Sequence, residues 1–104
     1  MQILAIDKLT KGTTEEKMRH HLPKELAHTI QLYLDEKIRT FFFRKDRPGV
    51  VFIMESDSLD EAQRVINELP LVKEKLLDFE LVPIGPLKPL EILLTAPGAY
   101  IKIS

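Results

Sequence analysis

Apolar residues fill two neighbouring runs in the middle of the chain almost without interruption. The runs are 38–43 (IRTFFF) and 50–54 (VVFIM), and the polar segment 44–49 (RKDRPG) separates them. This pattern predicts two strands joined by a tight turn, with Gly49 taking the positive φ that such a turn requires. A hairpin with one face in water alternates apolar and polar positions. Because these runs do not alternate, we expect both faces of the hairpin to be covered.

Two further strands are predicted near the ends of the chain. Residues 2–8 (QILAIDK) and 78–85 (DFELVPIG) form short apolar runs bounded by turn residues. The stretch 71–77 is expected to be a connection with some helical character. A proline-flanked segment follows at 87–94.

Helices are predicted in the two long intervals between the strands. Thr14 and Ser58 carry side-chain oxygens that cap a helix start, and acidic residues follow each of them. The later helix is expected over 59–69. In the earlier interval Pro23 indicates a second helix start and a break near residue 21, since proline is favoured at the first helical position. Beyond it, residues at spacings of three and four form an apolar stripe that we expect to pack on the sheet: Leu26, Ile30, Tyr33 and Leu34.

The order of predicted elements is strand, helix, strand, strand, helix, strand, which is the ferredoxin-like βαββαβ arrangement of an α+β fold. Both helices then lie on one face of a four-stranded antiparallel sheet, and the other face is bare. A second copy packed on that face across a two-fold axis covers the apolar hairpin. We therefore expect a dimeric α/β barrel, a homodimer through the sheet face. One domain is expected at 1–94, with a tail at 95–104 that forms an edge strand or crosses to the neighbouring subunit.

Composition narrows the classes of function. The chain has 104 residues and a formal net charge of -1, so no large positive field attracts nucleic acid. It has no cysteine, which excludes thiol nucleophiles and thiolate metal sites. Charged residues appear too early for a signal peptide or a membrane span, so we expect a cytoplasmic protein with no membrane partner. There is no glycine-rich phosphate loop or haem motif, and no cofactor is expected.

Several segments together resemble a known family. They are IR…FR on the second strand, SLDEA at the second helix start, ELPLV, and DFELVPIGPL on the last strand, spread over residues 38–87. This pattern resembles the muconolactone isomerase-like group of dimeric α/β-barrel proteins. Glu36 and Lys37 stand where the resemblance places a glycine. The resemblance implies a sheet-to-sheet dimer with a small-molecule cavity between sheet and helices, in a group that includes isomerases and cofactor-free oxygenases.

Isomerisation of a muconolactone moves a proton on a carbon next to a conjugated carbonyl. It requires a base with a pKa near neutral and a positive clamp for the substrate carboxylate. His21, Glu25 and His28 lie at spacings of four and three on one helical stripe. We predict His21 as the base, Glu25 as the group that orients it, and His28 as a further contact to the substrate. The alternatives are a solvated helix flank and, more weakly, a metal site that lacks a fourth ligand; we predict no metal.

Two more side chains are candidates for the same site. Asp78 begins the last strand, where a buried carboxylate acquires a raised pKa and acts as acid or base. Its structural alternative is to terminate the preceding turn. Tyr33 is expected in the core with its hydroxyl at the rim of the cavity.

Arg39 and Arg44 are the candidate clamps for a substrate carboxylate. They are separated by an odd number of residues, so a regular strand points them to opposite faces, and only a bulge brings both to one ligand. Each has a structural alternative. For Arg39 the alternative is an ion pair with Glu55 or Glu80, and for Arg44 it is a pair with Asp46 in the turn.

Two functions therefore stay open. The first is a small dimer that binds an organic acid or lactone and isomerises it by proton transfer. The second is a non-catalytic ligand-binding or assembly module, with a cofactor-free oxygenase as a further enzyme option. Convergence of His21, Arg39 and Asp78 on one cavity favours the enzyme, and scattered positions favour the module. An RNA-recognition module shares the strand order but needs a glycine-punctuated aromatic motif that FFFRKDRPGVVFIM lacks.

Overall fold

Four strands form one antiparallel sheet in the order β2-β3-β1-β4. They are β1 (Gln2–Leu9), β2 (Ile38–Phe43), β3 (Val50–Glu55) and β4 (Leu77–Ile84). The structure is a computed structural model, and it describes residues 1–95. The order of strands and helices confirms the predicted ferredoxin-like α+β fold.

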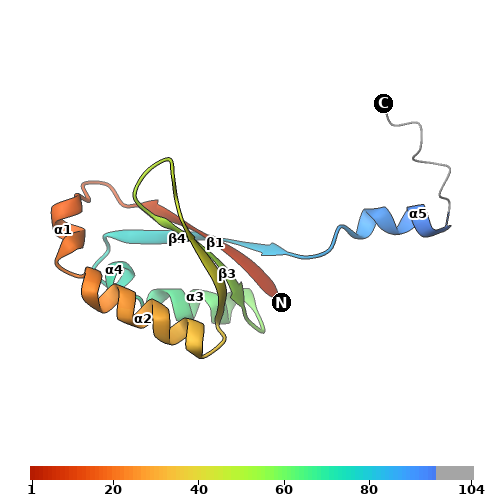
Figure 1. Cartoon of the computed structure of the whole chain (residues 1–104), viewed down its shortest axis with the longest axis horizontal. Coiled ribbons are helices and arrows are strands. Elements are labelled where there is room, and N and C mark those ends of the chain that lie inside the picture. The colour runs from red at the N-terminus through yellow and green to blue at the C-terminus, as the bar shows by residue number, and fades with distance from the viewer. Residues whose placement is uncertain (96–104) are drawn as a thin grey trace.

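Four helices lie on one face of the sheet (Figure 1). They are α1 (Glu15–Arg19), α2 (Leu22–Leu34), α3 (Leu59–Asn67) and the short α4 (Pro70–Lys73). Among the described residues, none of these helices has the length and apolar character that a membrane span requires. The helices and the sheet therefore form two layers.

The predicted helix starts are confirmed. The Thr14 hydroxyl accepts a hydrogen bond from the Lys17 N–H at 3.2 Å, and the Ser58 hydroxyl accepts one from the Glu61 N–H at 3.1 Å. Each bond satisfies a backbone donor that the helix itself leaves free. Pro23 lies in the first turn of α2, where its missing N–H costs nothing.

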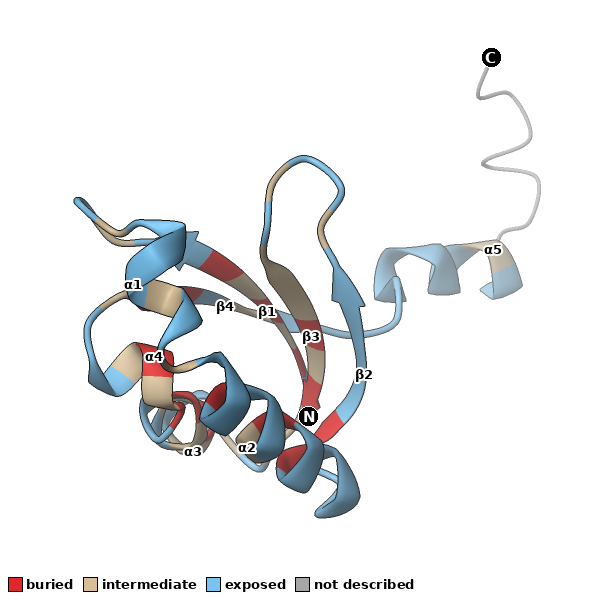
Figure 2. Ribbon diagram, turned by 60° about the vertical axis from the view of Figure 1, so that its left-hand side comes forward, coloured by how far each residue is buried: buried red, intermediate tan, exposed pale blue. Residues whose placement is uncertain are grey.

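Alternation along the strands places the core between the two layers. Side chains that point to the helices are buried, among them Ile3 and Ala5 of β1, Phe52 and Met54 of β3, and Phe79 of β4. Figure 2 shows buried segments on β3, α2 and α4. Phe52 and Phe79 stack with ring centroids 5.3 Å apart. Helix α3 covers them with a buried face of its own, at Ala62 and Ile66.

The other face of the sheet is covered by no helix of residues 1–95. We call it the open face, and the strand register assigns seven apolar side chains to it: Leu4, Ile6, Phe42, Val51, Ile53, Val82 and Ile84. The hairpin is therefore apolar on both sides. One side packs against the helices, and the other side is part of the open face. A second subunit over that face stays a prediction.

The predicted orientation of α2 is wrong. The stripe expected to pack on the sheet is exposed, with Leu26 at 51%, Ile30 at 55%, Tyr33 at 48% and Leu34 at 66%. The buried side chains of α2 are instead Glu25, Thr29 and Leu32. The helix is therefore rotated so that a carboxylate and a hydroxyl face the sheet and apolar side chains face outward.

Beyond β4 the chain leaves the sheet and projects away from it (Figure 1). This arm contains a 3-10 helix, η1 (Lys88–Glu91), and one turn of α-helix, α5 (Ile92–Thr95). The edge strand predicted for the tail lies in residues 96–104, outside the described residues. The prediction of one domain over 1–94 stays a prediction.

Candidate active site

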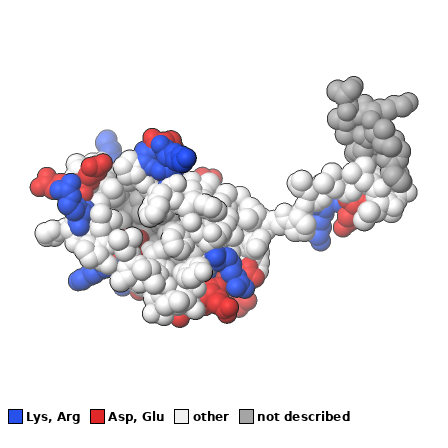
Figure 3. All heavy atoms as spheres, viewed as in Figure 1, with Lys and Arg blue, Asp and Glu red and all other residues white. Residues whose placement is uncertain are grey.

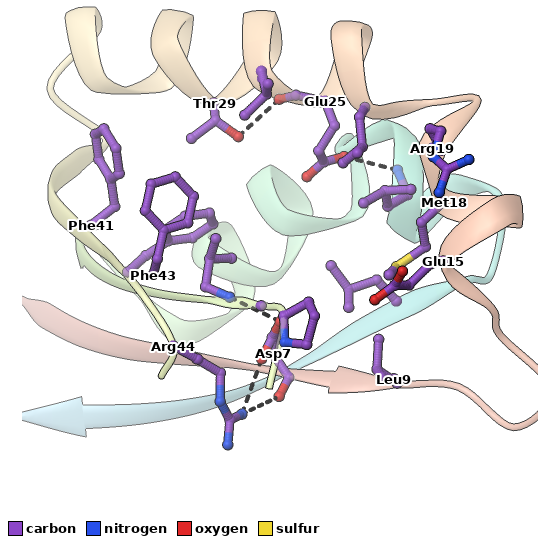
Figure 4. A pocket seen from close by; sticks show the side chains of 18 residues that line it. Asp7, Leu9, Glu15, Met18, Arg19, Glu25, Thr29, Phe41, Phe43 and Arg44 are labelled. Atoms are coloured by element: carbon purple, nitrogen blue, oxygen red, sulfur yellow. Dashed lines mark hydrogen bonds and ion pairs between the residues drawn. The ribbon is translucent and has the colours of Figure 1, made fainter. Parts of the chain in front are cut away.

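A cavity of about 370 Å³ lies between the sheet and helices α1 and α2 (Figure 4). Its volume is within the range of small-ligand sites. Most of its wall is apolar, and the charged side chains in it are few. The apolar residues that line it are Leu9, Met18, Leu22, Leu26, Phe41, Phe43, Pro48, Val50, Phe52, Leu71 and Leu77, and the charged ones are Asp7, Glu15, Arg19, Glu25 and Arg44.

Glu25 projects from the buried side of α2 toward this cavity (Figure 4). One carboxylate oxygen, Oε1, accepts a hydrogen bond from the Leu71 N–H at 2.9 Å, where α4 begins. Within residues 1–95, the other oxygen accepts none. Burial raises the pKa of Glu25 above its ordinary 4.5, and the Leu71 hydrogen bond offsets part of that rise. Glu25 is therefore a buried carboxyl group with a free oxygen at the cavity.

Asp7 forms the opposite wall and holds the β2–β3 turn in place. Its side chain is only 1% exposed. Oδ1 accepts hydrogen bonds from Arg44 Nη1 at 3.0 Å and Arg47 Nη2 at 2.9 Å, and Oδ2 accepts one from the Val50 N–H at 3.0 Å. The buried carboxylate is thus paired and saturated, as a buried charge must be.

Arg44 also pairs with Asp46 across the turn, as the structural alternative predicted. Arg44 Nε donates to Asp46 Oδ1 at 2.9 Å, and Nη2 donates to Oδ2 at 2.6 Å. These hydrogen bonds lower the pKa of Asp46 to about 2 and raise that of Arg44. The guanidinium charge of Arg44 is therefore already matched by two carboxylates. Its role as a substrate clamp stays a prediction.

Gly49 is required for a reason other than the one predicted. The positive φ expected there is wrong, since Gly12 is the glycine with positive φ among residues 1–95, at 82°. A Cβ at Gly49 would overlap the Asp7 carboxylate and lie 2.7 Å from Arg47 Nη1. Only a residue without a side chain lets the turn approach Asp7 so closely.

His21, the predicted base, does not line the cavity. It is the N-cap residue of α2 and borders a separate hollow with Thr14, His20 and Glu74. The hydrogen bond that the Glu25 carboxylate accepts comes from Leu71, so the predicted His21–Glu25 pair is not formed. The catalytic role of His21 stays a prediction without support from its position.

His28 and Tyr33 also lie outside the cavity wall. The pKa of Glu68 is lowered by its hydrogen bond from Lys73 and, more weakly, by the nearby His28. Tyr33 is half exposed, not in the core, and packs edge to face on Phe41, with ring centroids 5.9 Å apart. Because Phe41 lines the cavity, Tyr33 contacts a residue of its wall.

Arg39 and Asp78 do not line the cavity into which Glu25 projects. A bulge between Ile38 and Thr40 places Arg39 out of register, and its ion pair at 3.7 Å is with Glu36, not with the predicted Glu55 or Glu80. Asp78 is exposed, and the burial predicted for it is wrong. It neighbours the buried Leu77 and Phe79, so strand alternation points it to the open face.

His21, Arg39 and Asp78 are therefore scattered, and the residues that converge are a different set. Of the predicted site residues, Glu25 and Arg44 line the cavity. Asp7 and Arg19 were not predicted. The position of Asp7 can be inferred from the sequence, because Asp7 follows Ile3 and Ala5 at the spacing of two that places residues on one face of a strand. No group of three or more His, Asp or Glu side chains in the described part of the chain is placed to hold a metal ion.

Comparison with solved structures identifies a similar protein, 5-chloro-2-hydroxyhydroquinone dehydrochlorinase from Burkholderia phenoliruptrix AC1100, in complex with 2,5-dihydroxybenzoquinone. The TM-score is 0.62 at 23% sequence identity, and the match covers 86% of this chain and 98% of that one. No protein-family model matches the sequence, and no curated protein sequence matches it. At this identity the similarity is one of fold, and it agrees with the ferredoxin-like α+β arrangement described above.

Proposed function

We propose that this chain binds a small organic ring compound in the cavity between the sheet and α1 and α2, and that Glu25 exchanges a proton with it. The observation that carries the proposal is a buried carboxyl group with a free oxygen at an apolar cavity of about 370 Å³. The dehydrochlorinase of similar fold was solved with a quinone, which supports a ring compound as the ligand class.

The charges around the cavity favour a neutral ligand over a carboxylate. Arg44 is paired with Asp7 and Asp46, so it offers no unmatched positive charge. Glu25 repels an anion. The cation without an ion pair in the described residues that line the cavity is Arg19, on α1. We therefore propose a lactone, a hydroxylated ring or a quinone rather than a free organic acid.

The proton transfer needs a carbon acid next to a conjugated carbonyl. The Glu25 carboxylate removes the proton, the C–H electron pair forms a carbon–carbon double bond, and the carbonyl π electrons move to oxygen. The oxyanion then re-forms the carbonyl, the conjugated double bond shifts, and its electron pair takes the proton from the protonated Glu25 at another carbon. The Glu25 carboxylate is regenerated, and the product is an isomer of the substrate. Burial raises the pKa of Glu25, which makes its carboxylate a stronger base than an exposed one, and the positive charge of Arg19, which lines the same cavity, would stabilise the oxyanion.

A thermal-shift screen of matched neutral and acidic ring compounds tests the proposal. A ligand at 100 times its dissociation constant is expected to add about 2.7 kcal/mol to the stability of the wild type. Glu25→Gln is expected to lower the affinity for a hydroxylated ring compound about tenfold. A hydroxyl that donates a hydrogen bond to the charged Glu25 carboxylate binds more strongly than one that donates to a neutral amide. Arg39→Ala, outside the cavity, is the control and leaves the affinity unchanged. A ligand bound equally by wild type and Glu25→Gln would contradict a role for Glu25.

The scattered positions of His21, Arg39 and Asp78 favour a second function, a ligand-binding module without catalysis. The two functions share the cavity and differ in the proton transfer. A wild type that binds a lactone at the cavity and leaves its double bond in place over days supports the module. Conversion to an isomer, lost in Glu25→Gln by a factor of roughly 100 or more, supports the enzyme.

We also propose that two copies pair through the open face, because its seven apolar side chains form a continuous surface that a monomer leaves in water. Ile53→Asp introduces a charge at the centre of that face and is expected to give a monomer in sedimentation velocity. Leu59→Asp, on α3, is the matched control and stays dimeric. A wild type that sediments as a monomer, or an Ile53→Asp variant that stays dimeric, would refute this pairing.

A further inference from the structure

Three polar side chains are buried among residues 1–95, and all three line the cavity. Asp7 is 1% exposed, Glu25 6% and Thr29 8%. Burying a polar group is costly unless hydrogen bonds compensate it. Asp7 anchors the β2–β3 turn, and Glu25 is the proposed base. Thr29 has no part in either role, so its position in the cavity wall has a different reason.

The Thr29 hydroxyl has one proton, and that proton is bonded to the helix backbone. Oγ1 donates to the Glu25 carbonyl at 2.9 Å, one turn back along α2. A hydroxyl oxygen also has two lone pairs that accept hydrogen bonds. Within residues 1–95, Oγ1 accepts none. Thr29 therefore presents an acceptor and no donor to the cavity.

The free polar atoms of the buried wall are thus both acceptors. One is Thr29 Oγ1 and the other is the Glu25 oxygen that accepts no hydrogen bond within residues 1–95, while the Asp7 oxygens are taken by the turn. Residues four apart on a helix have Cβ atoms about 5–6 Å apart, so the two acceptors lie side by side. Figure 4 shows both side chains on the cavity side of α2. A ligand with two donors on one edge satisfies both of them.

The surroundings of this pair are apolar. Phe41, Phe43 and Phe52 line the same cavity. Figure 3 shows an uncharged centre with charged side chains gathered toward the margins of the molecule. In such surroundings a hydrogen bond is stronger than in water, and an acceptor left without a donor costs more. A ligand whose oxygens are all carbonyls or ethers leaves both acceptors unpaired.

We propose that Thr29 determines specificity by accepting a hydrogen bond from a ring hydroxyl of the ligand. The ligand is then a ring with two donor groups on one edge: a hydroxyl for Thr29, and an O–H or C–H for Glu25. The bond to Thr29 also fixes which ring atom lies against Glu25. This inference rests on the proposed function and narrows its ligand class from lactones, quinones and hydroxylated rings to the hydroxylated rings.

The probes for this inference are the three dihydroxybenzenes and their monomethyl ethers, each titrated into the protein by calorimetry. The wild type is expected to bind its preferred dihydroxybenzene about fivefold more tightly than the matching ether, which has lost one donor. Thr29→Val, of nearly the same shape, is expected to weaken the dihydroxybenzene about tenfold. The ether is expected to change by less than about twofold, because its single hydroxyl binds the charged Glu25, the stronger acceptor.

Thr29→Ser is the matched control, since it keeps the hydroxyl and loses only a methyl group. Its affinity for the dihydroxybenzene is expected to stay within about twofold of the wild type. If Thr29→Val does not fold, Thr29→Ala and the ranking of the probes by the wild type give the answer. Equal weakening of both probes by Thr29→Val, or a Thr29→Ser variant that binds no better than Thr29→Val, would show that Thr29 only packs.

The same probes separate this inference from the proposed function. A lactone or quinone that binds in the cavity, with no dihydroxybenzene bound, would overturn the role of Thr29 and leave the proposed function standing. No binding of any ring compound would overturn both.

Discussion

Replacing Asp7 with alanine is expected to lower the free energy of unfolding by about 3 kcal/mol, measured by urea denaturation at neutral pH. The substitution removes the one carboxylate that Arg44, Arg47 and the Val50 N–H share. Two guanidinium groups lose a buried carboxylate acceptor, and the Val50 N–H is left without its partner behind the turn. The β2–β3 turn then loses its attachment to the centre of the sheet.

Asp46→Ala is the matched control for Asp7. It removes the other carboxylate bound to Arg44, but its side chain is 63% exposed and water replaces it readily. Its stability is expected to stay close to that of the wild type. Equal stabilities of Asp7→Ala and Asp46→Ala would contradict the view that Asp7 anchors the turn. Asp7→Asn, which keeps the volume and one acceptor oxygen, is expected to fall between Asp7→Ala and the wild type.

Glu25→Gln is expected to change how stability depends on pH. Burial raises the pKa of Glu25 in the folded state above its ordinary 4.5, so folding favours the protonated form. The favourable contribution is therefore complete below pH 4.5 and is lost as pH rises through the folded pKa. Each unit by which the folded pKa exceeds 4.5 costs the wild type about 1.4 kcal/mol once Glu25 ionises. Glutamine cannot ionise, so the variant gains stability relative to the wild type as pH rises.

Urea denaturation of wild type and Glu25→Gln from pH 4 to pH 8 measures this difference. Thr29→Val is the matched control, because Thr29 is buried one turn along α2 and donates to the Glu25 carbonyl at 2.9 Å, yet does not titrate. It is expected to shift stability by the same amount at every pH. A difference between Glu25→Gln and wild type that does not change with pH would show that the Glu25 carboxyl is not desolvated.

The order of elements and the helix starts were predictable because they depend on local signals. Thr14, Ser58 and Pro23 each act within one turn, and the hairpin is defined by neighbouring residues. Glu36, one of the two residues that stand where the resemblance places a glycine, has a positive φ of 63°, which the sequence did not predict.

The orientation of α2 was not predictable from periodicity alone. Helix α2 has an apolar stripe at Leu26, Ile30 and Tyr33, and packing that stripe on the sheet is the usual solution. Here Glu25 and Thr29 face the sheet because a cavity occupies the space and Leu71 supplies a donor to the carboxylate. A donor 46 residues away in the chain has no signature in the helix pattern.

The positions of several charged side chains were not predictable for the same reason. Asp78 and Arg39 are candidates by residue type, but strand alternation and a bulge decide where each points. Asp7 follows the same alternation into the core, and its partners Arg44 and Arg47 come from the turn 37 and 40 residues later. Strand parity, read together with the hairpin register, was the information needed to find it.

The most direct test of the central claim is to locate a ligand from the thermal-shift screen by NMR on methyl-labelled protein. The account predicts that its addition shifts the methyl signals of Met18, Val50 and Leu71, which line the cavity, and leaves those of Leu4 and Ile53 on the open face in place. Shifts confined to Leu4 and Ile53 would put the ligand on the open face and contradict the cavity as the binding site.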